Sequence, residues 1–488
     1  MRALGGFLVI LLAFYFPAFV TAYAVSSDFP LLAATLENRG AAPPFNIAGD
    51  HPLYWYITNL AFASVGGFAE LAYLRLLAVV LTAVVSWLLY RICLGAGWGR
   101  YEAFFVAVMV VTMPPFQVYV SWASLYLYPL AGALGAAALV AAEKLFRASE
   151  PGRSGAVRYA WPLAAVILLQ LALAISAPAA MLFWAAAAVV LFRPGASLRH
   201  MVPRFSAYAA VVAASLALDL TRGRWAGLFH GQAAADSSAF KLPADVFQKL
   251  RWFGQEPLAN ALNLFLLFPA SWIAVVAGSA IVIGLLLYLE ESPEKRLAKL
   301  ALALLIAPLS YLPGLLAEEN WPAYRTLPAL TAVLTLYAFF ALCGYLKRLS
   351  RFTAVPPVAG VLALPSLLCG ALAFYNVHNY FSLPLSIEYQ WLRAQVLTEQ
   401  LAAARRIYVV AASWRESIAP GVRYDEFGLP FSAQPYAVKP AVYIVLRESR
   451  PEKARTPVDL VSADAPFRPP PASIVVDMTK IISFRGRI

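Results

Sequence analysis

The sequence is poor in charged residues and in the residue types that build common soluble catalytic centres. Only 13% of its residues are charged, whereas 61% are hydrophobic, a balance that a water-soluble fold with a polar shell does not easily sustain. Its four histidines and three cysteines are too scattered to predict a metal cluster or a disulfide framework. It also lacks a Gly-rich P-loop and the HExxH and GxSxG motifs, so the corresponding nucleotide, zinc and serine-hydrolase sites are not expected.

What the chain has instead is long apolar runs separated by short polar loops. A helix of roughly 20 apolar residues spans the hydrocarbon core and satisfies its own backbone hydrogen bonds. The pattern therefore predicts a polytopic α-helical membrane protein with about eleven transmembrane helices. The predicted spans are Ala3 to Tyr23, Ala69 to Leu94, Glu102 to Val118, Trp122 to Phe146, Tyr159 to Ile175, Ala179 to Phe192, Phe205 to Leu220, Ala261 to Leu289, Leu297 to Ala317, Leu327 to Leu346 and Pro356 to Tyr375.

Lysine and arginine crowd into every second loop, and this asymmetry predicts the orientation. The positive-inside rule places these loops, and Arg2 with them, in the cytoplasm. An odd number of spans then puts the C-terminal segment on the opposite side. The net charge of +12 follows from topology and anionic lipid, so no nucleic-acid partner is predicted. The basic loops are Arg91 to Arg100, Lys144 to Arg158, Arg193 to Arg204, Lys295 to Lys299 and Lys347 to Arg351.

Two domains are expected from this organisation. Residues 1–377 form a transmembrane domain with extracytoplasmic loops at 24–68 and 221–260. Residues 378–488 form a small extracytoplasmic α/β domain. In that domain the pattern predicts a helix and three strands: the helix at Ser386 to Arg406, and the strands at Ile407 to Ala411, Ala441 to Leu446 and Ser473 to Val476.

Ionisable residues are nearly absent from the middle of the predicted spans. Charges at the bilayer centre usually mark an ion or substrate path, whereas Glu70, Arg75 and Asp219 lie near span ends, where snorkelling to the interface costs little. An ion-coupled transporter is therefore disfavoured, and chemistry at the outer membrane surface is favoured.

Two outward segments, Ser26 to Pro30 and Gly49 to Tyr56, carry a family resemblance. With them the chain resembles the GT-C superfamily of polyprenyl-phosphate-dependent glycosyltransferases, which includes the protein O-mannosyltransferases and the aminoarabinose transferases of lipid A. In those families an acid in the first outward loop lies at the active site, and a His-Pro-Pro-Leu-type motif follows. Asp28 occupies the position of that acid, and His51-Pro52-Leu53 resembles the motif with one proline missing.

The familiar Asp-Glu pair is absent, because Phe29 follows Asp28, and this leaves open whether Asp28 or Asp50 is the catalytic base. A later segment, Glu318 to Arg325, is similar to the Arg-containing outer loop that GT-C enzymes place against the donor phosphate. The resemblance therefore implies one set of site residues and no metal ligand: Asp28 and Asp50 as catalytic candidates, and Arg325, His51, Arg75, Glu319 and Tyr324 as substrate-binding and phosphate-binding candidates.

Each candidate also has a structural interpretation. Asp28 is equally well a helix cap or a solvated loop residue, and Asp50 is suited to cap a helix that begins near Pro52. His51 is commonly a packed residue of an interface. Arg325 would pair with Glu318 or Glu319 if it were only a flanking anchor, and a snorkelling side chain explains Arg75.

The resemblance implies an enzyme that transfers a hexosyl or pentosyl group from a polyprenyl-phosphate donor. The acceptor would be a glycan, lipid or protein on the extracytoplasmic face of a bacterial inner membrane, in the cell envelope. No cofactor is expected beyond this donor substrate, and nothing in the sequence supports a divalent metal. The alternatives are a lipid or glycan transporter and a noncatalytic accessory subunit of envelope polysaccharide assembly.

Overall fold

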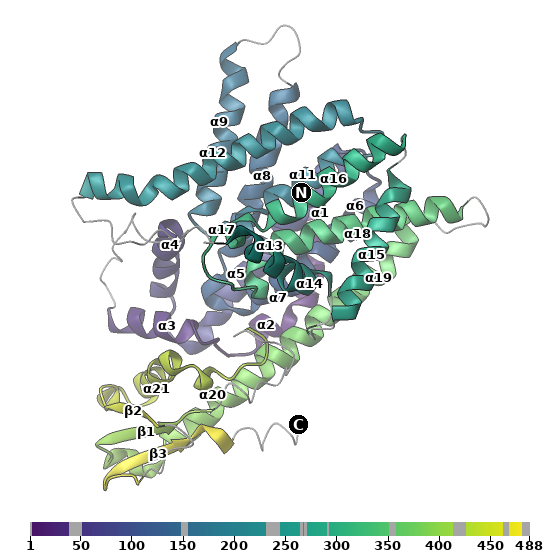
Figure 1. The fold of residues 1–488 in the computed structure, drawn as a ribbon. Helices are drawn as coiled ribbons and strands as arrows, with labels where there is room; N and C mark the ends of the chain where they lie inside the picture. The colour runs from purple at the N-terminus through teal and green to yellow at the C-terminus, as the bar shows by residue number, and fades with distance from the viewer. Residues whose placement is uncertain are drawn as a thin grey trace.

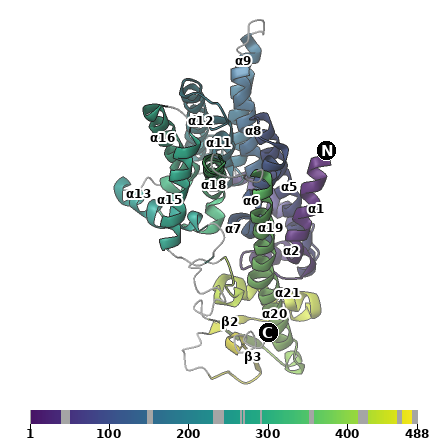
Figure 2. The ribbon, with the colours of Figure 1, turned by 90° about the vertical axis from the view of Figure 1, so that its right-hand side faces the viewer.

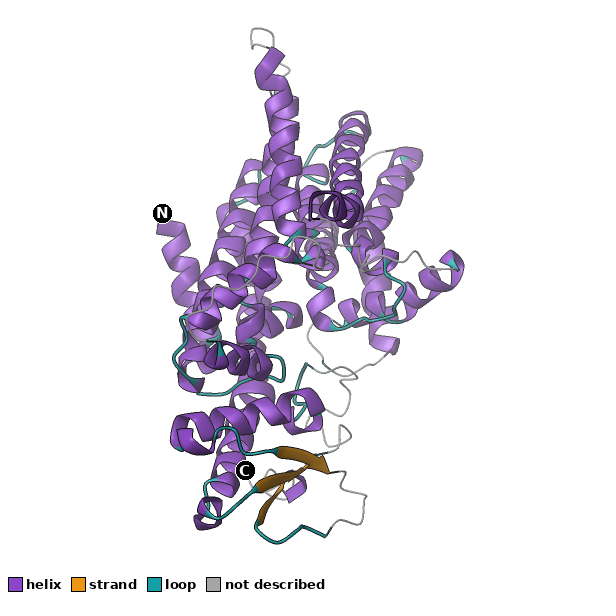
Figure 3. Ribbon diagram, turned by 90° about the vertical axis from the view of Figure 1, so that its left-hand side faces the viewer, coloured by secondary structure: helices purple, strands orange, loops and turns teal. Residues whose placement is uncertain are grey.

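A computed structural model gives the fold of the chain as a helical bundle with a small sheet at one end. It describes residues 2–38, 51–147, 155–230, 245–263, 267, 271–289, 292–350, 358–412, 426–461 and 468–480. Asp50, one of the two candidate bases, lies outside these residues. Helices make up almost all of the described chain, and the strands lie together at the end that carries the C-terminal segment (Figure 1, Figure 3).

The helices up to residue 230 cover the first part of the bundle: α1 (Arg2–Phe14), α2 (Phe16–Val20), α3 (Asp28–Glu37), α4 (Pro52–Ala63), α5 (Leu71–Gly95), α6 (Arg100–Thr112), α7 (Pro114–Ser121), α8 (Tyr128–Arg147), α9 (Gly155–Leu173), α10 (Ala177–Ala180), α11 (Leu182–Leu191) and α12 (Leu198–His230). The later helices complete the bundle and enter the C-terminal region: α13 (Val246–Gln255), α14 (Pro257–Leu262), α15 (Ser271–Tyr288), α16 (Pro293–Ser310), α17 (Leu312–Leu316), α18 (Pro328–Leu349), α19 (Val358–Val377), α20 (Leu383–Val396) and α21 (Pro435–Ser449).

Every predicted span overlaps at least one of these helices, but the count of eleven is not confirmed. Among the described residues, five helices are long and apolar enough to cross a membrane, or six if α6 and α7, bent by 61°, form one broken span. Prolines at the starts of α2, α7 and α17 shorten several of the others, because proline removes a backbone donor and clashes with the preceding turn. These helices nevertheless make the chain a multi-pass membrane protein. The five are Phe68–Gly95, Ala123–Phe146, Leu198–Thr221, Pro328–Leu349 and Val358–Val396.

The C-terminal region contains a three-stranded parallel sheet with the order β2-β1-β3. Its strands are β1 (Arg406–Val410), β2 (Val458–Val461) and β3 (Ser473–Asp477). The predictions for β1 and β3 agree with these bounds, whereas β2 was not predicted. The prediction of a strand at 441–446 is wrong, because these residues lie within α21. A short run of buried β-branched residues does not distinguish a strand from a buried helix.

The helix predicted from Ser386 begins earlier and ends earlier than expected. Helix α19 continues through the π-helical turn His378–Ser382 into α20, so the predicted domain boundary at 377/378 falls inside one helical column. Figure 2 shows this column reaching from the bundle to the sheet.

Aromatic ring contacts, one stacked and one tilted, attach the C-terminal region to Phe29 of α3 and to Phe68 before α5. The ring centroids of Phe68 and Tyr389 are 3.6 Å apart, and those of Phe29 and Phe431 are 4.5 Å apart. Such pairs add attraction beyond the burial of their area. They fix α3, and Asp28 at its start, between the bundle and the C-terminal region.

Candidate functional site

Asp28 begins α3 and is completely buried. One carboxylate oxygen accepts hydrogen bonds from the backbone N–H groups of Val25, at 2.9 Å, and Ala123, at 3.3 Å. The other accepts from the N–H of Ser124 at 2.8 Å. Asp28 therefore joins the start of α3 to the start of the 3₁₀ helix η2 (Ala123–Leu125), which follows α7.

The same turn is held by two further side chains, Ser27 before α3 and Tyr54 in α4. The hydroxyl oxygens of Ser27 and Ser124 lie 2.9 Å apart, and the Tyr54 hydroxyl donates to the carbonyl oxygen of Ser124 at 2.9 Å. Residues Trp122 to Ser124 are almost entirely buried. Helix α7 thus ends in a turn that Asp28, Ser27 and Tyr54 bind from one side.

Arg325 contacts this turn through the ring of Trp122. It lies in the 3₁₀ helix η3 (Tyr324–Thr326), and its guanidinium carbon is 5.1 Å from the centre of the Trp122 ring and 5.8 Å from that of Trp321. The Tyr119 hydroxyl donates to the Arg325 carbonyl oxygen at 2.7 Å. The Arg325 side chain is 21% exposed, so its cationic head lies at a surface between two aromatic faces.

Glu426 fixes Arg325 from the C-terminal region. Its two carboxylate oxygens accept from the N–H groups of Tyr324, at 2.6 Å, and Arg325, at 2.8 Å. The same carboxylate lies 3.8 Å from a guanidinium nitrogen of Arg325. Because its side chain is fully buried, Glu426 both caps η3 and balances part of the arginine charge.

Trp122 connects the two charged residues. It directly precedes Ala123, whose N–H donates to Asp28, and its ring faces the guanidinium group of Arg325. The indole Nε1–H is buried and has no hydrogen-bond partner among the residues that the structure describes. An indole nitrogen can only donate, and an unsatisfied buried donor of this kind calls for an oxygen acceptor.

Arg75, another phosphate candidate, is completely buried in α5. Its guanidinium donates to the carbonyl oxygens of Ala18, at 2.5 Å, Tyr23, at 2.9 Å, and Thr21, at 3.2 Å. It also lies 3.9 Å from the centre of the Tyr23 ring. Arg75 therefore satisfies carbonyl groups at and after the end of α2, directly before the loop that contains Asp28.

The remaining candidates lie at three places. Nδ1 of His51 is 3.3 Å from the carbonyl oxygen of Leu173, which places the start of α4 against the end of α9. Tyr324 is buried beside Glu426. Glu319 is exposed, and its carbonyl oxygen accepts from Nζ of Lys249 at 2.9 Å.

Burial dominates the electrostatics of the groups around Asp28. Desolvation raises the pKa of Asp28, while the hydrogen bond from Val25, the charge of Arg75 and the contacts with Ser124 counteract the rise. Desolvation likewise raises the pKa of Tyr23 to about 12, with Arg75 acting in the opposite direction. The Asp28 carboxyl is therefore a stronger base than an exposed aspartate.

The structure thus brings Asp28 and Arg325 to one turn, and it places Tyr324 beside them. The charge of Arg75 acts on Asp28, whereas the backbone of Glu319 contacts Lys249 instead. Among the described residues no group of three or more His, Cys, Asp and Glu side chains is arranged to hold a metal ion.

Sequence reasoning missed Glu426 and Trp122 as functional candidates. Glu426 belongs to the segment Glu426-Phe427-Gly428-Leu429-Pro430, which carries no recognisable motif, and its contact with Arg325 joins distant parts of the chain. Trp122 was interpreted only as the start of a span. The one sequence signal for it is the pair of serines, Ser121 and Ser124, that flanks Trp122 between two apolar runs.

Comparisons with known proteins give structural neighbours but no close relatives. No protein-family model and no curated protein sequence matches the chain. AglB, an archaeal oligosaccharyltransferase from Archaeoglobus fulgidus solved with an inhibitory peptide and a dolichol phosphate, is 13% identical, with 89% of this chain and 64% of that chain covered and a TM-score of 0.42. The apo form of the Archaeoglobus fulgidus oligosaccharyltransferase is 11% identical, with 90% and 65% covered and a TM-score of 0.45.

ArnT from Cupriavidus metallidurans in the apo state is 12% identical, with 89% of this chain and 85% of that chain covered and a TM-score of 0.40. The chain spans less than two thirds of the length of the two oligosaccharyltransferase chains.

Proposed function

We propose that the chain is a membrane glycosyltransferase of the GT-C type that uses a polyprenyl-phosphate-linked sugar. The observation that carries the proposal is that a buried acid, Asp28, and a largely buried arginine, Arg325, both contact the Trp122–Ser124 turn. Sugar transfer from a lipid phosphate requires a base for the acceptor and a cation for the departing phosphate.

Arg325 is the proposed phosphate ligand. A guanidinium binds two phosphate oxygens at once, which an ammonium group does not reproduce. Glu426 holds the Arg325 backbone and side chain in place. The unpaired indole N–H of Trp122 is a second donor for an oxygen of the donor phosphate or sugar.

Asp28 is the proposed base. An ionised carboxylate offers about four lone-pair sites, and the N–H groups of Val25, Ala123 and Ser124 occupy three of them. The remaining site takes the proton from the acceptor hydroxyl. The acceptor oxygen then bonds to the anomeric carbon, and the bond from that carbon to the phosphate oxygen breaks, which releases polyprenyl phosphate. Asp50, outside the described residues, is the alternative base.

The supporting residues follow from the same proposal. In this proposal Tyr324 lies beside the donor site, because it precedes Arg325 and its N–H donates to Glu426, and Arg75 supports the loop before Asp28. His51, which contacts the end of α9, and the exposed Glu319 are the remaining candidates for substrate binding. The site faces the extracytoplasmic side of a bacterial inner membrane, with the N-terminus in the cytoplasm and residues 378–488 outside. The transferred group is a hexose or pentose, and the acceptor is a glycan, lipid or protein.

A complementation experiment tests the proposal against the transporter and accessory-subunit alternatives. Cells without the gene receive wild-type protein, Arg325→Gln or, as a control, Arg251→Gln, an exposed arginine of α13. Mass spectrometry then measures lipid-linked sugars and envelope glycans. We expect Arg325→Gln to accumulate the lipid-linked sugar and to lose its glycan product, while Arg251→Gln behaves as wild type. Full product formation by a stably inserted Arg325→Gln protein would refute the assignment.

A further inference from the structure

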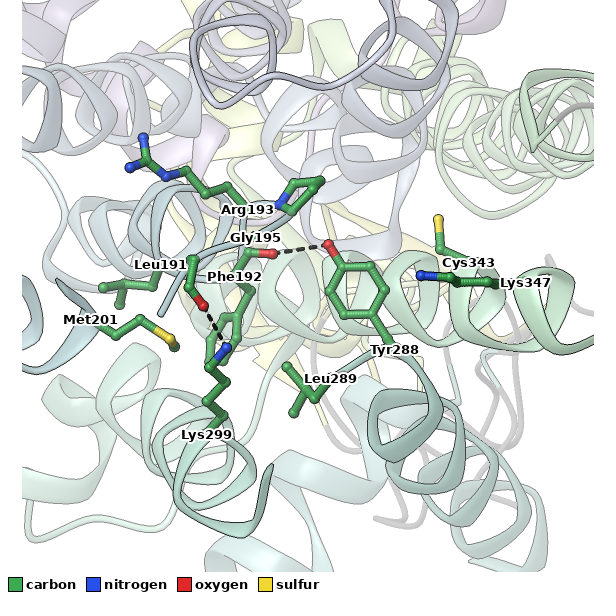
Figure 4. Close-up of a pocket in the computed structure, with 12 residues that line it drawn as sticks. Leu191, Phe192, Arg193, Gly195, Met201, Tyr288, Leu289, Lys299, Cys343 and Lys347 are labelled. Atoms are coloured by element: carbon green, nitrogen blue, oxygen red, sulfur yellow. Dashed lines mark hydrogen bonds between the residues drawn. The ribbon is translucent and has the colours of Figure 1, made fainter. Parts of the chain in front are cut away.

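A second polar site lies at the ends of α11, α15, α16 and α18. There the structure contains a cavity of about 360 Å³. Figure 4 shows Arg193, Lys299 and Lys347 around it, together with Tyr288, Leu289 and Cys343. None of its described lining residues is acidic. The cavity is therefore a basic pocket between the ends of membrane helices.

Close packing of α15 against α18 builds one wall of this pocket. A side chain at Gly344 would meet the backbone of Gly284 and of Tyr288, and one at Gly284 would meet Ala341. Tyr288 follows Gly284 by four residues and Lys347 follows Gly344 by three, so each lies on the same helix face as its glycine. The two glycines thus bring Tyr288 and Lys347 to one opening.

Two hydrogen bonds fix the opposite wall. The Tyr288 hydroxyl donates to the carbonyl oxygen of Phe192 at 3.0 Å, and Nζ of Lys299 donates to the carbonyl oxygen of Ala196. Lys299 is only 6% exposed, and a lysine is rarely buried to this extent. The loop between α11 and α12 is therefore held over a buried ammonium group.

A neighbouring cavity of about 430 Å³ shares Arg193 with the pocket. Its walls include the apolar side chains of Trp87, Leu139 and Val190, and two more cations, Arg91 and Lys144, line it. The acid there, Glu143, lies 3.1 Å from Arg204. Cations beside an apolar wall match a molecule with a phosphate and a hydrocarbon part.

We propose that the pocket of Arg193, Lys299 and Lys347 binds the phosphate group of an anionic ligand. Basic pockets between membrane helices on the cytoplasmic side bind phospholipid headgroups, and arginine and lysine are the usual phosphate-binding side chains. The headgroup of an anionic phospholipid and a soluble phosphate share this chemistry. All three cations belong to the loops that the sequence places in the cytoplasm, so this pocket is separate from the glycosyltransferase site.

A charge-matched pair of double variants tests this site. Arg193→Gln with Lys347→Gln removes two exposed pocket cations, whereas Arg199→Gln with Arg348→Gln removes two exposed cations that do not line the pocket. Each full-length protein is reconstituted in phosphatidylcholine nanodiscs. Binding is titrated separately with phosphatidylglycerol and with inorganic phosphate, and it is read out by native mass spectrometry and by Tm.

We expect the wild-type protein and the control pair to bind one of the two probes, and the pocket pair to bind it about 30-fold more weakly, since each cation near a membrane surface contributes about 1 kcal/mol. Binding of phosphatidylglycerol alone identifies a lipid site, and an equal response to inorganic phosphate identifies a soluble ligand. Equal weakening by both pairs, or no binding of either probe to the wild type, would overturn the proposal.

Discussion

Asp28 in the membrane bundle and Glu388 in the C-terminal region are both completely buried carboxylates with nearly the same backbone contacts. Asp28 accepts from the first two N–H groups of η2. Glu388, on α20, accepts at 3.0 Å from the N–H groups of Phe431 and Ser432, which begin the 3₁₀ helix η7 (Phe431–Ala433). Burial and capping by themselves therefore do not identify a catalytic acid.

The surroundings of the two acids differ. Glu388 also accepts from the Ser432 hydroxyl at 2.5 Å, so three of its hydrogen bonds come from one short helix. Asp28 accepts from Val25 in a separate segment, and it interacts electrostatically with Arg75. It also lies next to Trp122, whose ring contacts Arg325. The chain thus uses one capping device twice, and Asp28 in addition interacts with Arg75 and lies next to Trp122.

The largest expected effect is a difference in the rate of sugar transfer between variants of Asp28 and of Glu388. Asp28→Asn and Glu388→Gln each weaken a cap, which costs about 0.5 to 2 kcal/mol of stability. Only Asp28→Asn should also lower the rate of sugar transfer, by about 10² to 10⁴, because it removes a general base. Tm and kcat of the purified proteins measure the two effects. Equal losses of kcat in both folded variants would assign Asp28 a purely structural role.

The next effect concerns the cation. Arg325→Lys keeps the charge but loses the bidentate geometry, so we expect kcat/KM to fall by about tenfold or more, equivalent to about 1.4 kcal/mol. Arg251→Lys on α13 serves as the control. The Glu426 contact to the backbone of residue 325 does not depend on its side chain, so Tm should change little. A large drop in Tm with unchanged turnover would contradict this prediction.

A smaller effect is expected from the indole donor. Trp122→Phe keeps an aromatic ring below Arg325 and removes only the Nε1–H. We expect the variant to bind the polyprenyl-phosphate sugar about tenfold more weakly, since a hydrogen bond to a charged group contributes roughly 1.5 to 3 kcal/mol. Trp184→Phe is a matched control, because its Nε1 is also buried without a partner in the described structure. Similar changes of KM in both variants would exclude a hydrogen bond from Trp122 to the substrate.

The smallest effect is a pH trend. Because desolvation raises the pKa of Asp28, the folded protein holds this proton more tightly than the unfolded chain does. The ionisation of Asp28 therefore costs stability progressively as pH rises from the usual aspartate value of about 3.9 to the folded pKa, and the cost is constant above it. Relative to Asp28→Asn, wild-type Tm should fall across that window. A constant difference in Tm from pH 4 to pH 8 would contradict the prediction.

The sequence predicts best what depends on local pattern. Apolar runs place the helices, and short runs of β-branched and aromatic residues locate β1 and β3. The nearness of Asp28 and Arg325 followed from a resemblance between short motifs. Glu426 could not be predicted, because a carboxylate that caps a distant 3₁₀ helix leaves no periodic signal around itself.

The errors also have physical causes. Residues 441–446 are apolar, and all of them except Tyr443 are buried, so this stretch lacks the polar face that reveals helical periodicity. The count of eleven spans is not confirmed, because proline introduces bends and breaks within the apolar runs that hydropathy alone does not register.

The continuous helical column of α19 and α20 connects the C-terminal region directly to the bundle. Residues 358–396 form one apolar helical stretch of 39 residues, and Trp391 near its far end donates to the carbonyl oxygen of Asp477 at 3.2 Å, at the tip of β3. A rod of this length, about 60 Å at 1.5 Å per residue, converts a small tilt in the lipid into a much larger sideways displacement of the sheet. We therefore expect a change in the tilt of this column to displace the sheet.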